Sequence, residues 1–96
     1  GDIAGEPGKP RFIVDPLDGT SNFLHAIPHF AISIAVQEPA LGGGWGDVTA
    51  ALVYQPVTDE SYWAERGRGA WLHDRRLRVG ARRQLNECLV ATGIPY

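Results

Sequence analysis

Two carboxylates that stand three residues apart give this chain its clearest capacity for chemistry. Asp15 and Asp18 flank Pro16-Leu17, where a predicted strand over residues 11–15 ends in a turn, so both side chains can point at the same place. Magnesium prefers oxygen ligands in a near-octahedral shell, commonly one or two carboxylates with phosphate oxygens and water. The backbone carbonyl of Leu17 is free in such a turn and can supply a further ligand. These residues predict a magnesium site.

The residues that follow Asp18 are suited to binding a phosphate group. Their pattern predicts a short helix over residues 19–25, which Thr20 or Ser21 caps and Pro28 ends. The first N–H groups of a helix have no intrahelical partner and lie at the positive end of its dipole, so they attract anions. Gly19 lets the backbone approach the anion closely. Metal and phosphate would then be neighbours, as metal-assisted phosphoryl transfer requires.

The same motif also has a purely structural interpretation. Asp-Gly is a common turn sequence, and Asp followed by Thr or Ser is an ordinary helix cap. A calcium loop of the EF-hand type is excluded, because it needs ligands at alternate positions and a glutamate at the twelfth, and neither follows Asp15. Taken alone, the pattern Asp-x-x-Asp-Gly therefore leaves the structural and the catalytic interpretations open.

The elements that must position these residues are mainly strands. Residues 30–37 alternate between large side chains on one face and small ones on the other, which predicts a strand buried on both faces. Further strands are expected at 48–55, 61–66, 70–72 and 76–79, with a glycine-rich loop at 38–47, a helical turn at 85–87 and a last buried strand at 89–92. Most connections are short enough for hairpins, so the pattern predicts an antiparallel meander with one short helix.

The composition indicates a globular chain and narrows the possible partners. Hydrophobic residues make up 44% and charged residues 21%, a composition too apolar for a disordered chain. The formal net charge is −2, which is too balanced to favour nucleic acid or a membrane as a partner. No apolar run approaches the ~20 residues that span a bilayer. The single Cys88 lies in an apolar run and is expected to be a small buried hydrophobe, which suits a reducing cytoplasm.

Two further features favour structural interpretations. His25 and His29 have the spacing of helical metal ligands, but Pro28 between them breaks a shared helix face, so packing or a dimer contact is expected. The glycine run at residues 42–44 is not a phosphate loop, because no Gly-Lys-Ser or Gly-Lys-Thr follows it. It is expected to form the end of a hairpin.

The clustered arginines and the three tryptophans are most simply explained by structural roles. Five arginines form an arginine cluster: Arg75, Arg76, Arg78, Arg82 and Arg83. A solvated strand and turn is the favoured interpretation, and binding of RNA or another acidic partner is the alternative. The three tryptophans are expected to pack or stack locally: Trp45, Trp63 and Trp71.

Four segments, in order along the chain, resemble the inositol monophosphatase family. Residues 12–23, which read Phe-Ile-Val-Asp-Pro-Leu-Asp-Gly-Thr-Ser-Asn-Phe, are similar to its signature, and residues 24–35 resemble its bacterial members in particular. Residues 64–72 and 91–96 are similar to later segments of the family. Four ordered segments are far more specific than one short motif, so the chain is identified as a member of this family from about Arg11 to its end.

The resemblance implies a role for each residue of the motif. Asp15 and Asp18 would be metal ligands for Mg²⁺, with Asp15 bridging two ions, and Leu17 would add its backbone carbonyl. Gly19 and Thr20 would bind the phosphate, and the Thr20 hydroxyl would orient the attacking water. Asp15, Asp18 and Thr20 are thus the expected catalytic residues.

The resemblance also implies a fold and an activity. The fold would be α/β (α+β), a layered sugar-phosphatase-type sandwich of mostly antiparallel sheet with helices, usually dimeric and inhibited by lithium. The activity would be Mg-dependent hydrolysis of a phosphate monoester, first of all inositol monophosphate to inositol and phosphate. Alternative substrates are histidinol phosphate, fructose bisphosphate and nucleotide bisphosphates. The alternative function is a non-catalytic metal- or phosphate-binding module that contacts RNA or protein through the arginine cluster.

Two departures from the family pattern concern the ends of the chain. The family has a metal-binding glutamate farther upstream than the 14 residues that precede Asp15, so Glu6 is too close for that role. A later aspartate of the family lies beyond Tyr96. Residues 1–96 are therefore expected to be an internal, partial inositol monophosphatase-like domain that holds about half of a site and is inactive alone.

Overall fold

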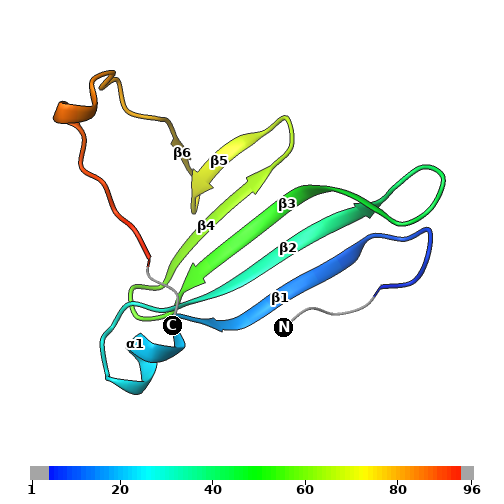
Figure 1. The fold of residues 1–96 in the computed structure, drawn as a ribbon, viewed down its shortest axis with the longest axis horizontal. Helices are drawn as coiled ribbons and strands as arrows, with labels where there is room; N and C mark the ends of the chain where they lie inside the picture. Colours follow the sequence, from blue (N-terminus) through cyan, green and yellow to red (C-terminus); the bar gives the residue numbers. More distant parts are fainter. Residues whose placement is uncertain (1–4, 94–96) are drawn as a thin grey trace.

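One antiparallel sheet of six strands, in the same order as the sequence, forms most of the computed structural model, which describes residues 5–93 (Figure 1). The strands are β1 (Arg11–Asp18), β2 (Ala31–Pro39), β3 (Trp45–Gln55), β4 (Glu60–Glu65), β5 (Gly69–Leu72) and β6 (Arg75–Leu77). A helix, α1 (Thr20–Leu24), follows β1, and a 3-10 turn, η1 (Leu85–Glu87), follows β6. The predicted antiparallel meander with one short helix is confirmed, as is the helical turn at 85–87. Neither α1 nor η1 has the length or apolarity of a membrane-spanning helix.

The first strand does not end where the sequence suggests. β1 runs through Pro16 to Asp18, and its pairing with β2 shifts register between Asp15 and Asp18. Proline is tolerated here because β1 is an edge strand. Pro16 also lies within the shift in register, where regular pairing is interrupted, so its missing N–H breaks no regular ladder hydrogen bond. The predicted end of the strand at Asp15 is therefore wrong, and the two carboxylates lie on either side of a bulge within one strand.

The hairpin between β2 and β3 is longer than predicted. Its loop covers residues 40–44 only, because pairing continues as far as Pro39 and Trp45. The three glycines of the loop, residues 42–44, all have positive φ, so they form the tip itself, while the flanking residues remain in the strands. Trp45 packs under the guanidinium of Arg11, whose Cζ lies 4.4 Å from the ring centroid. The remaining strands match the prediction to within one or two residues.

The turn between β3 and β4 is closed by a side-chain hydrogen bond. The Tyr54 hydroxyl donates to the Asp59 carboxylate over 2.7 Å. This hydrogen bond, with smaller contributions from desolvation and from the charge of Asp59, raises the pKa of Tyr54 above its ordinary value. Asp59 itself adopts positive φ, 52°, a conformation that aspartate tolerates better than most residues.

The last predicted strand does not form. Residues 88–93 have no strand structure, and the side chains of Leu89 and Val90 are 100% and 72% exposed. Cys88 is exposed as well, so the expectation of a buried thiol is also wrong. An apolar run needs a partner strand to become a strand, and within residues 5–93 this one lies against none.

The two faces of the sheet follow from the cross-strand register. One row of neighbours, on what we call the tryptophan face, is Val14, Ile34, Leu52, Trp63, Trp71 and Arg76. The row beside it, on what we call the Asp15 face, is Asp15, Ser33, Val53, Tyr62, Leu72 and Arg75. On the tryptophan face Trp63 and Trp71 stack at 5.6 Å with an interplanar angle of 11°, which confirms the predicted local stacking.

Nothing within the described residues covers either face. All nine residues of β2 are half-buried, and no residue between 5 and 93 is fully buried. Figure 1 shows why: α1 lies beside the end of β1, and the chain after β6 leaves the sheet instead of crossing it. Within residues 5–93 the strand over residues 30–37 is therefore only half-buried, and its burial on both faces stays a prediction for the full-length protein.

Candidate metal and phosphate site

The bulge in β1 is held by the side chain of the first carboxylate. Asp15 Oδ1 accepts a hydrogen bond from the backbone N–H of Leu17 over 3.2 Å. This local bond fixes the path of the chain across Pro16, and it leaves the other oxygen of Asp15 for a further contact. The chain then reaches Asp18 at the end of the strand, so this bulge determines the separation of the two carboxylates.

A second hydrogen bond joins the turn to the start of α1. The Thr20 hydroxyl donates to the backbone carbonyl of Leu17 over 3.1 Å. A carbonyl oxygen has two lone pairs, so the carbonyl of Leu17 can accept this bond and still ligate a cation. Asp15, Leu17 and Thr20 are thus connected through two hydrogen bonds within six residues of chain.

All five predicted site residues line one cavity. Its volume is about 710 Å³, and its wall includes Asp15, Leu17, Asp18, Gly19 and Thr20. Ser21 and Asn22 of α1 complete this part of the wall, and Thr92 and Gly93 approach from the other end of the chain. The structure therefore brings the predicted residues together, while their roles in binding remain predictions.

Gly19, and not Thr20 or Ser21, is the N-cap of α1. Its backbone is left-handed, with φ 90° and ψ 39°, and no side chain caps the helix. The prediction of a side-chain cap is wrong because the Thr20 hydroxyl is already bonded to Leu17. With only five residues, α1 has a weak dipole, so anion binding would depend on its individual N–H groups.

Alanine at Gly19 is expected to destabilise the full-length protein by about 2–3 kcal/mol, since left-handed backbone costs an L-residue about 1–2 kcal/mol and a tight contact adds to it. The new Cβ would lie 3.1 Å from the carbonyl oxygen of His29 and 3.3 Å from Cα of Phe30. Denaturant unfolding measures this change. Gly42→Ala is the matched control, because Gly42 has φ 88° and nothing within 4 Å. Equal losses for the two variants would contradict the role of close packing at Gly19.

Sequence reasoning gave no role to Asn22, which positions the segment after α1. Its side-chain amide donates to the carbonyl of His29 over 2.8 Å and so joins α1 to the start of β2. The sequence signal for this role was an asparagine within a short helix, just before a loop that contains Pro28. His25 does not reach the cavity: its Nδ1 lies 2.8 Å from the carbonyl oxygen of Ser21. His25 thus has a local structural contact, as predicted, whereas His29 is bonded within residues 5–93 only through its backbone, whose carbonyl accepts the bond from Asn22.

The described residues supply some of the ligands that a hard cation such as magnesium needs. Within residues 5–93 no three His, Cys, Asp or Glu side chains gather as a metal site, so the chain supplies two carboxylates and one carbonyl. Magnesium is commonly held by so few protein groups, with water and substrate phosphate completing its shell. The oxygen-only donors of Asp15, Leu17 and Asp18 suit magnesium and do not suit softer transition metals.

Comparison with known proteins identifies the chain. The model of the inositol monophosphatase family matches residues 1–96, the whole of the sequence. The chain belongs to the inositol monophosphatase family. An inositol-1-monophosphatase of Rhizobium meliloti (strain 1021) is 55% identical over 95 residues, which cover 99% of this chain and 34% of that protein. The Nus factor SuhB of Pseudomonas aeruginosa is 45% identical over 93 residues, which cover 97% of this chain and 32% of that protein.

Solved structures of inositol monophosphatase relatives share the fold. The extragenic suppressor protein suhB from Bartonella henselae aligns with a TM-score of 0.72 and 54% identity, over 83% of this chain and 31% of that one. SaIMPase-II with bound inositol monophosphate aligns with a TM-score of 0.65 and 34% identity, over 80% of this chain and 28% of that one. The chain thus spans about a third of the length of the family members that it matches.

Proposed function

We propose that this protein hydrolyses phosphate monoesters with the help of Mg²⁺, and that inositol monophosphate is its first substrate. The observation that carries the proposal is the single cavity lined by Asp15, Leu17, Asp18, Gly19 and Thr20. Membership of the inositol monophosphatase family supports a phosphatase. A relative that binds inositol monophosphate and one named inositol-1-monophosphatase support the substrate.

The carboxylates would hold the metal and the turn would hold the phosphate. Asp15, Asp18 and the carbonyl of Leu17 are the proposed ligands. Bound magnesium supplies charge neutralisation for the phosphate and lowers the pKa of water. The N–H groups at Gly19 and Thr20 lie at the start of α1, where helical N–H groups have no intrahelical partner, and they would donate to phosphate oxygens.

The hydrogen bond of Thr20 assigns its hydroxyl a direction. Because its proton is donated to the Leu17 carbonyl, the oxygen presents only lone pairs to the cavity. A water molecule beside it would therefore have to donate a proton to Thr20, which turns a lone pair of the water toward the phosphorus. Thr20 would position the nucleophile without taking its proton away.

Thr20→Ala in the full-length protein is expected to lower kcat by about 10–10²-fold, the effect of losing a group that positions a reactant. Metal affinity should change much less, because the ligands stay in place. Steady-state kinetics and magnesium titration of the same variant test this. Thr20→Ser, which keeps the hydroxyl, is the matched control and should retain most of the rate. A large loss of metal affinity with unchanged kcat would show that Thr20 serves the metal instead.

Hydrolysis itself is tested with a panel of monoesters. The full-length protein should release phosphate from inositol 1-phosphate with magnesium, and excess chelator should stop the release. Histidinol phosphate, fructose 1,6-bisphosphate and a nucleotide bisphosphate serve as the competing substrates. Activity that chelator leaves unchanged would disprove the metal dependence, and faster turnover of another ester would replace inositol monophosphate as the substrate.

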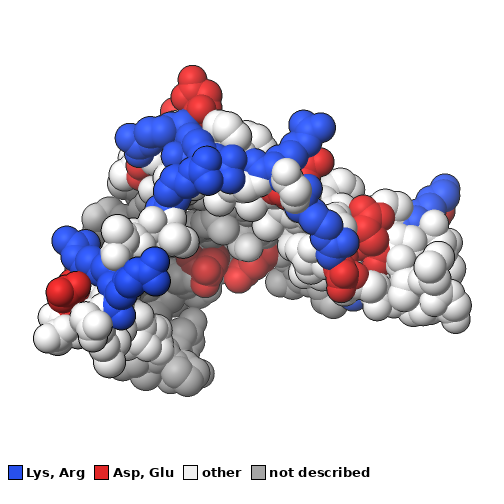
Figure 2. Space-filling model, turned by 90° about the horizontal axis from the view of Figure 1, so that it is seen from above, with Lys and Arg blue, Asp and Glu red and all other residues white. Residues whose placement is uncertain are grey.

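The arginine cluster favours a second candidate, a non-catalytic module that contacts RNA. Figure 2 shows blue Lys and Arg patches across the visible face, the largest of them in its upper part, with red Asp and Glu patches beside some of them. Asp74 is the only acidic residue between positions 66 and 83, a stretch that contains the whole arginine cluster. Several similar proteins are named Nus factor SuhB. Titrating RNA against the protein at two salt concentrations tests this candidate, because phosphate contacts weaken steeply with salt.

The proposal includes three further statements that rest on the resemblance. The active protein would be a homodimer, residues 1–96 would form part of a larger domain, and the location would be the cytoplasm. The exposed thiol of Cys88 suits a reducing compartment, where free thiols persist.

A further inference from the structure

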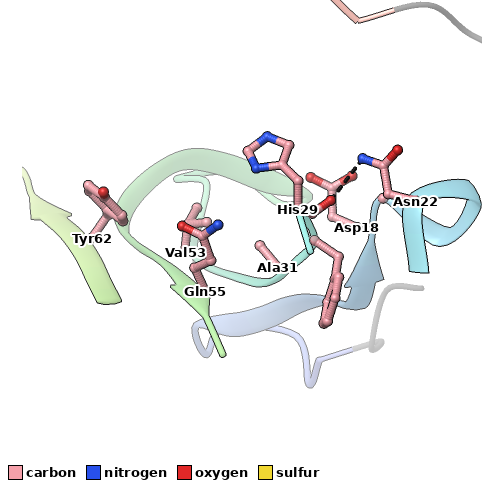
Figure 3. A pocket seen from close by; sticks show the side chains of 9 residues that line it. Asp18, Asn22, His29, Ala31, Val53, Gln55 and Tyr62 are labelled. Carbon is pink, nitrogen blue, oxygen red and sulfur yellow. Dashed lines mark hydrogen bonds between the residues drawn. The ribbon is translucent and has the colours of Figure 1, made fainter. Parts of the chain in front are cut away.

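The backbone carbonyl of His29 lies against the turn at Gly19 and Thr20, which we call the phosphate turn. Its oxygen accepts the hydrogen bond from the side-chain amide of Asn22 over 2.8 Å, the dashed line in Figure 3. The same oxygen would lie 3.1 Å from a Cβ at Gly19, and Cα of Phe30 would lie 3.3 Å from it. The backbone of Gly19 thus rests on residues 29–30, and Asn22 holds this support in place.

Asn22 also closes the loop between α1 and β2 through its own backbone. The N–H of Ile27 donates to the carbonyl of Asn22 over 2.8 Å, and the N–H of His29 donates to the carbonyl of Ile27 over 2.7 Å. Two residues after His29 the chain enters β2, where Ala31 pairs with Asp18 of β1. Asn22 therefore connects the position of α1 to the start of β2.

The helix α1 needs such an external anchor. It has five residues, and helices this short are not stable by themselves in water. Two side-chain contacts join it to the segment that leads into β2: the bond from Asn22 to His29, and the edge-on contact of Phe23 with Phe30, whose ring centroids lie 5.2 Å apart at 87°. The hydrogen bond is the more directional of the two, so it restricts the orientation of α1 most closely.

The proposed metal ligands are held by different bonds. The Asp15 carboxylate accepts from the N–H of Leu17, and the Thr20 hydroxyl donates to the carbonyl of Leu17. Both bonds lie within residues 15–20, so neither depends on Asn22. The metal ligands and the phosphate turn are thus positioned by separate sets of contacts, and a change at Asn22 should affect the second set alone.

Asn22 stands in the wall between two cavities. The second cavity has a volume of about 470 Å³ and shares Asp18, Gly19 and Asn22 with the first. The rest of its wall comes from the start of β2 and from β3 and β4 (Figure 3): His29, Phe30, Ala31, Val53, Gln55 and Tyr62. In the first cavity Asn22 lies on the same wall as the phosphate turn, while its amide is engaged by His29.

We infer that Asn22 is a positioning residue for the phosphate group of the substrate. It fixes the N–H groups of the phosphate turn relative to the metal ligands by holding the carbonyl of His29 under Gly19. This inference rests on the proposed function. The amide proton of Asn22 also offsets part of the negative charge on the His29 oxygen, which lies close to the place where an anion would bind.

The test separates phosphate binding from metal binding in the full-length protein. Asn22→Ala should raise KM for inositol 1-phosphate and the inhibition constant of inorganic phosphate together, by about 5–10-fold, the effect of losing about one hydrogen bond. Magnesium affinity, titrated without phosphate, should stay within about twofold of the wild type, as for a neutral substitution. Asn22→Leu keeps the volume and a good helix former but lacks the donor, so it should show the same split.

His25→Ala is the matched control. The His25 ring bonds to the carbonyl of Ser21 within the same short helix, but this bond does not join α1 to β2. The variant should leave both phosphate constants within about twofold of the wild type. An effect on phosphate equal to that of Asn22→Ala would overturn the inference, because it would show that only the stability of α1 matters.

The remaining outcomes distinguish the inference from the proposed function. If the wild type hydrolyses no monoester with magnesium, the proposed phosphatase function is wrong and the inference falls with it. If the wild type is active and the Asn22 variants leave the phosphate constants unchanged, or weaken magnesium binding as much as phosphate binding, the phosphatase stands and the inference is overturned. Should Asn22→Ala lower the thermal midpoint markedly, Asn22→Leu decides, because it preserves the volume of the side chain.

Discussion

Replacing Asp18 by asparagine in the full-length protein is expected to abolish turnover while leaving the fold intact. The substitution keeps the shape of the side chain but removes its charge, and the new amide directs a donor at the cation. Substituting residues that only support a metal ligand costs about 10–100-fold, so losing a ligand should exceed that loss. The fold should tolerate the change, because Asp18 is exposed and its side chain has no hydrogen bond or ion pair within residues 5–93.

The measurement pairs phosphate release with magnesium titration. Turnover of inositol and sugar phosphates should fall to background, and the thermal midpoint without metal should match that of the wild type. Asp47→Asn is the matched control, because Asp47 is an exposed aspartate whose carboxylate pairs with Arg66 over 2.7 Å, away from both cavities. Near-normal activity of Asp18→Asn across the panel would show that the metal assignment is wrong.

Residues 1–96 expressed alone are expected to be inactive and to unfold without a cooperative transition. The chain exposes 7837 Å², whereas a compact monomer of its mass exposes about 5,400 Å². Its radius of gyration is 16.2 Å, against about 13 Å for a compact chain of 100 residues. Large apolar side chains are open on both faces of the sheet, among them Phe12 at 56% and Val53 at 41% exposure. Such a sheet lacks the core that makes unfolding cooperative.

Circular dichroism during heating, dye binding to apolar surface and phosphatase assays with magnesium test this expectation. The full-length protein under the same conditions is the control and should show a sharp transition. A soluble monomer of residues 1–96 with a cooperative transition and real turnover would refute it. That result would mean that residues within this stretch complete the site.

The period of the side chains along the sequence was enough to predict most of the sheet. Strict alternation at residues 30–37 and 48–55 predicted β2 and β3, and short glycine- or aspartate-containing turns predicted hairpins. The errors have tertiary causes. Pro16 was expected to end β1, but an edge strand can contain a proline at a bulge. Residues 89–92 are as apolar as a strand, yet they have no neighbour among the described residues to pair with.

The layered arrangement of sheets and helices came from the family resemblance and not from periodicity. Alternation shows that a strand has two different faces, but it does not show what covers them. In the described structure neither face is covered, although β2 carries large side chains on one face and small ones on the other. Burial on both faces therefore could not be read from this sequence alone.

The sequence by itself determined the part of the first cavity's wall that carries the predicted site residues. Asp15, Leu17, Asp18, Gly19 and Thr20 lie within six residues, and two local hydrogen bonds with one left-handed glycine are enough to bring their polar groups together. Only the tertiary structure decided the second cavity. Val53, Gln55 and Tyr62 are more than thirty residues from Asp18 in the sequence, and they face it because the register of β1 to β4 places them on the same side of the sheet. A shift of one residue in any of those pairings would turn these side chains to the opposite face, and no local pattern fixes which pairing forms.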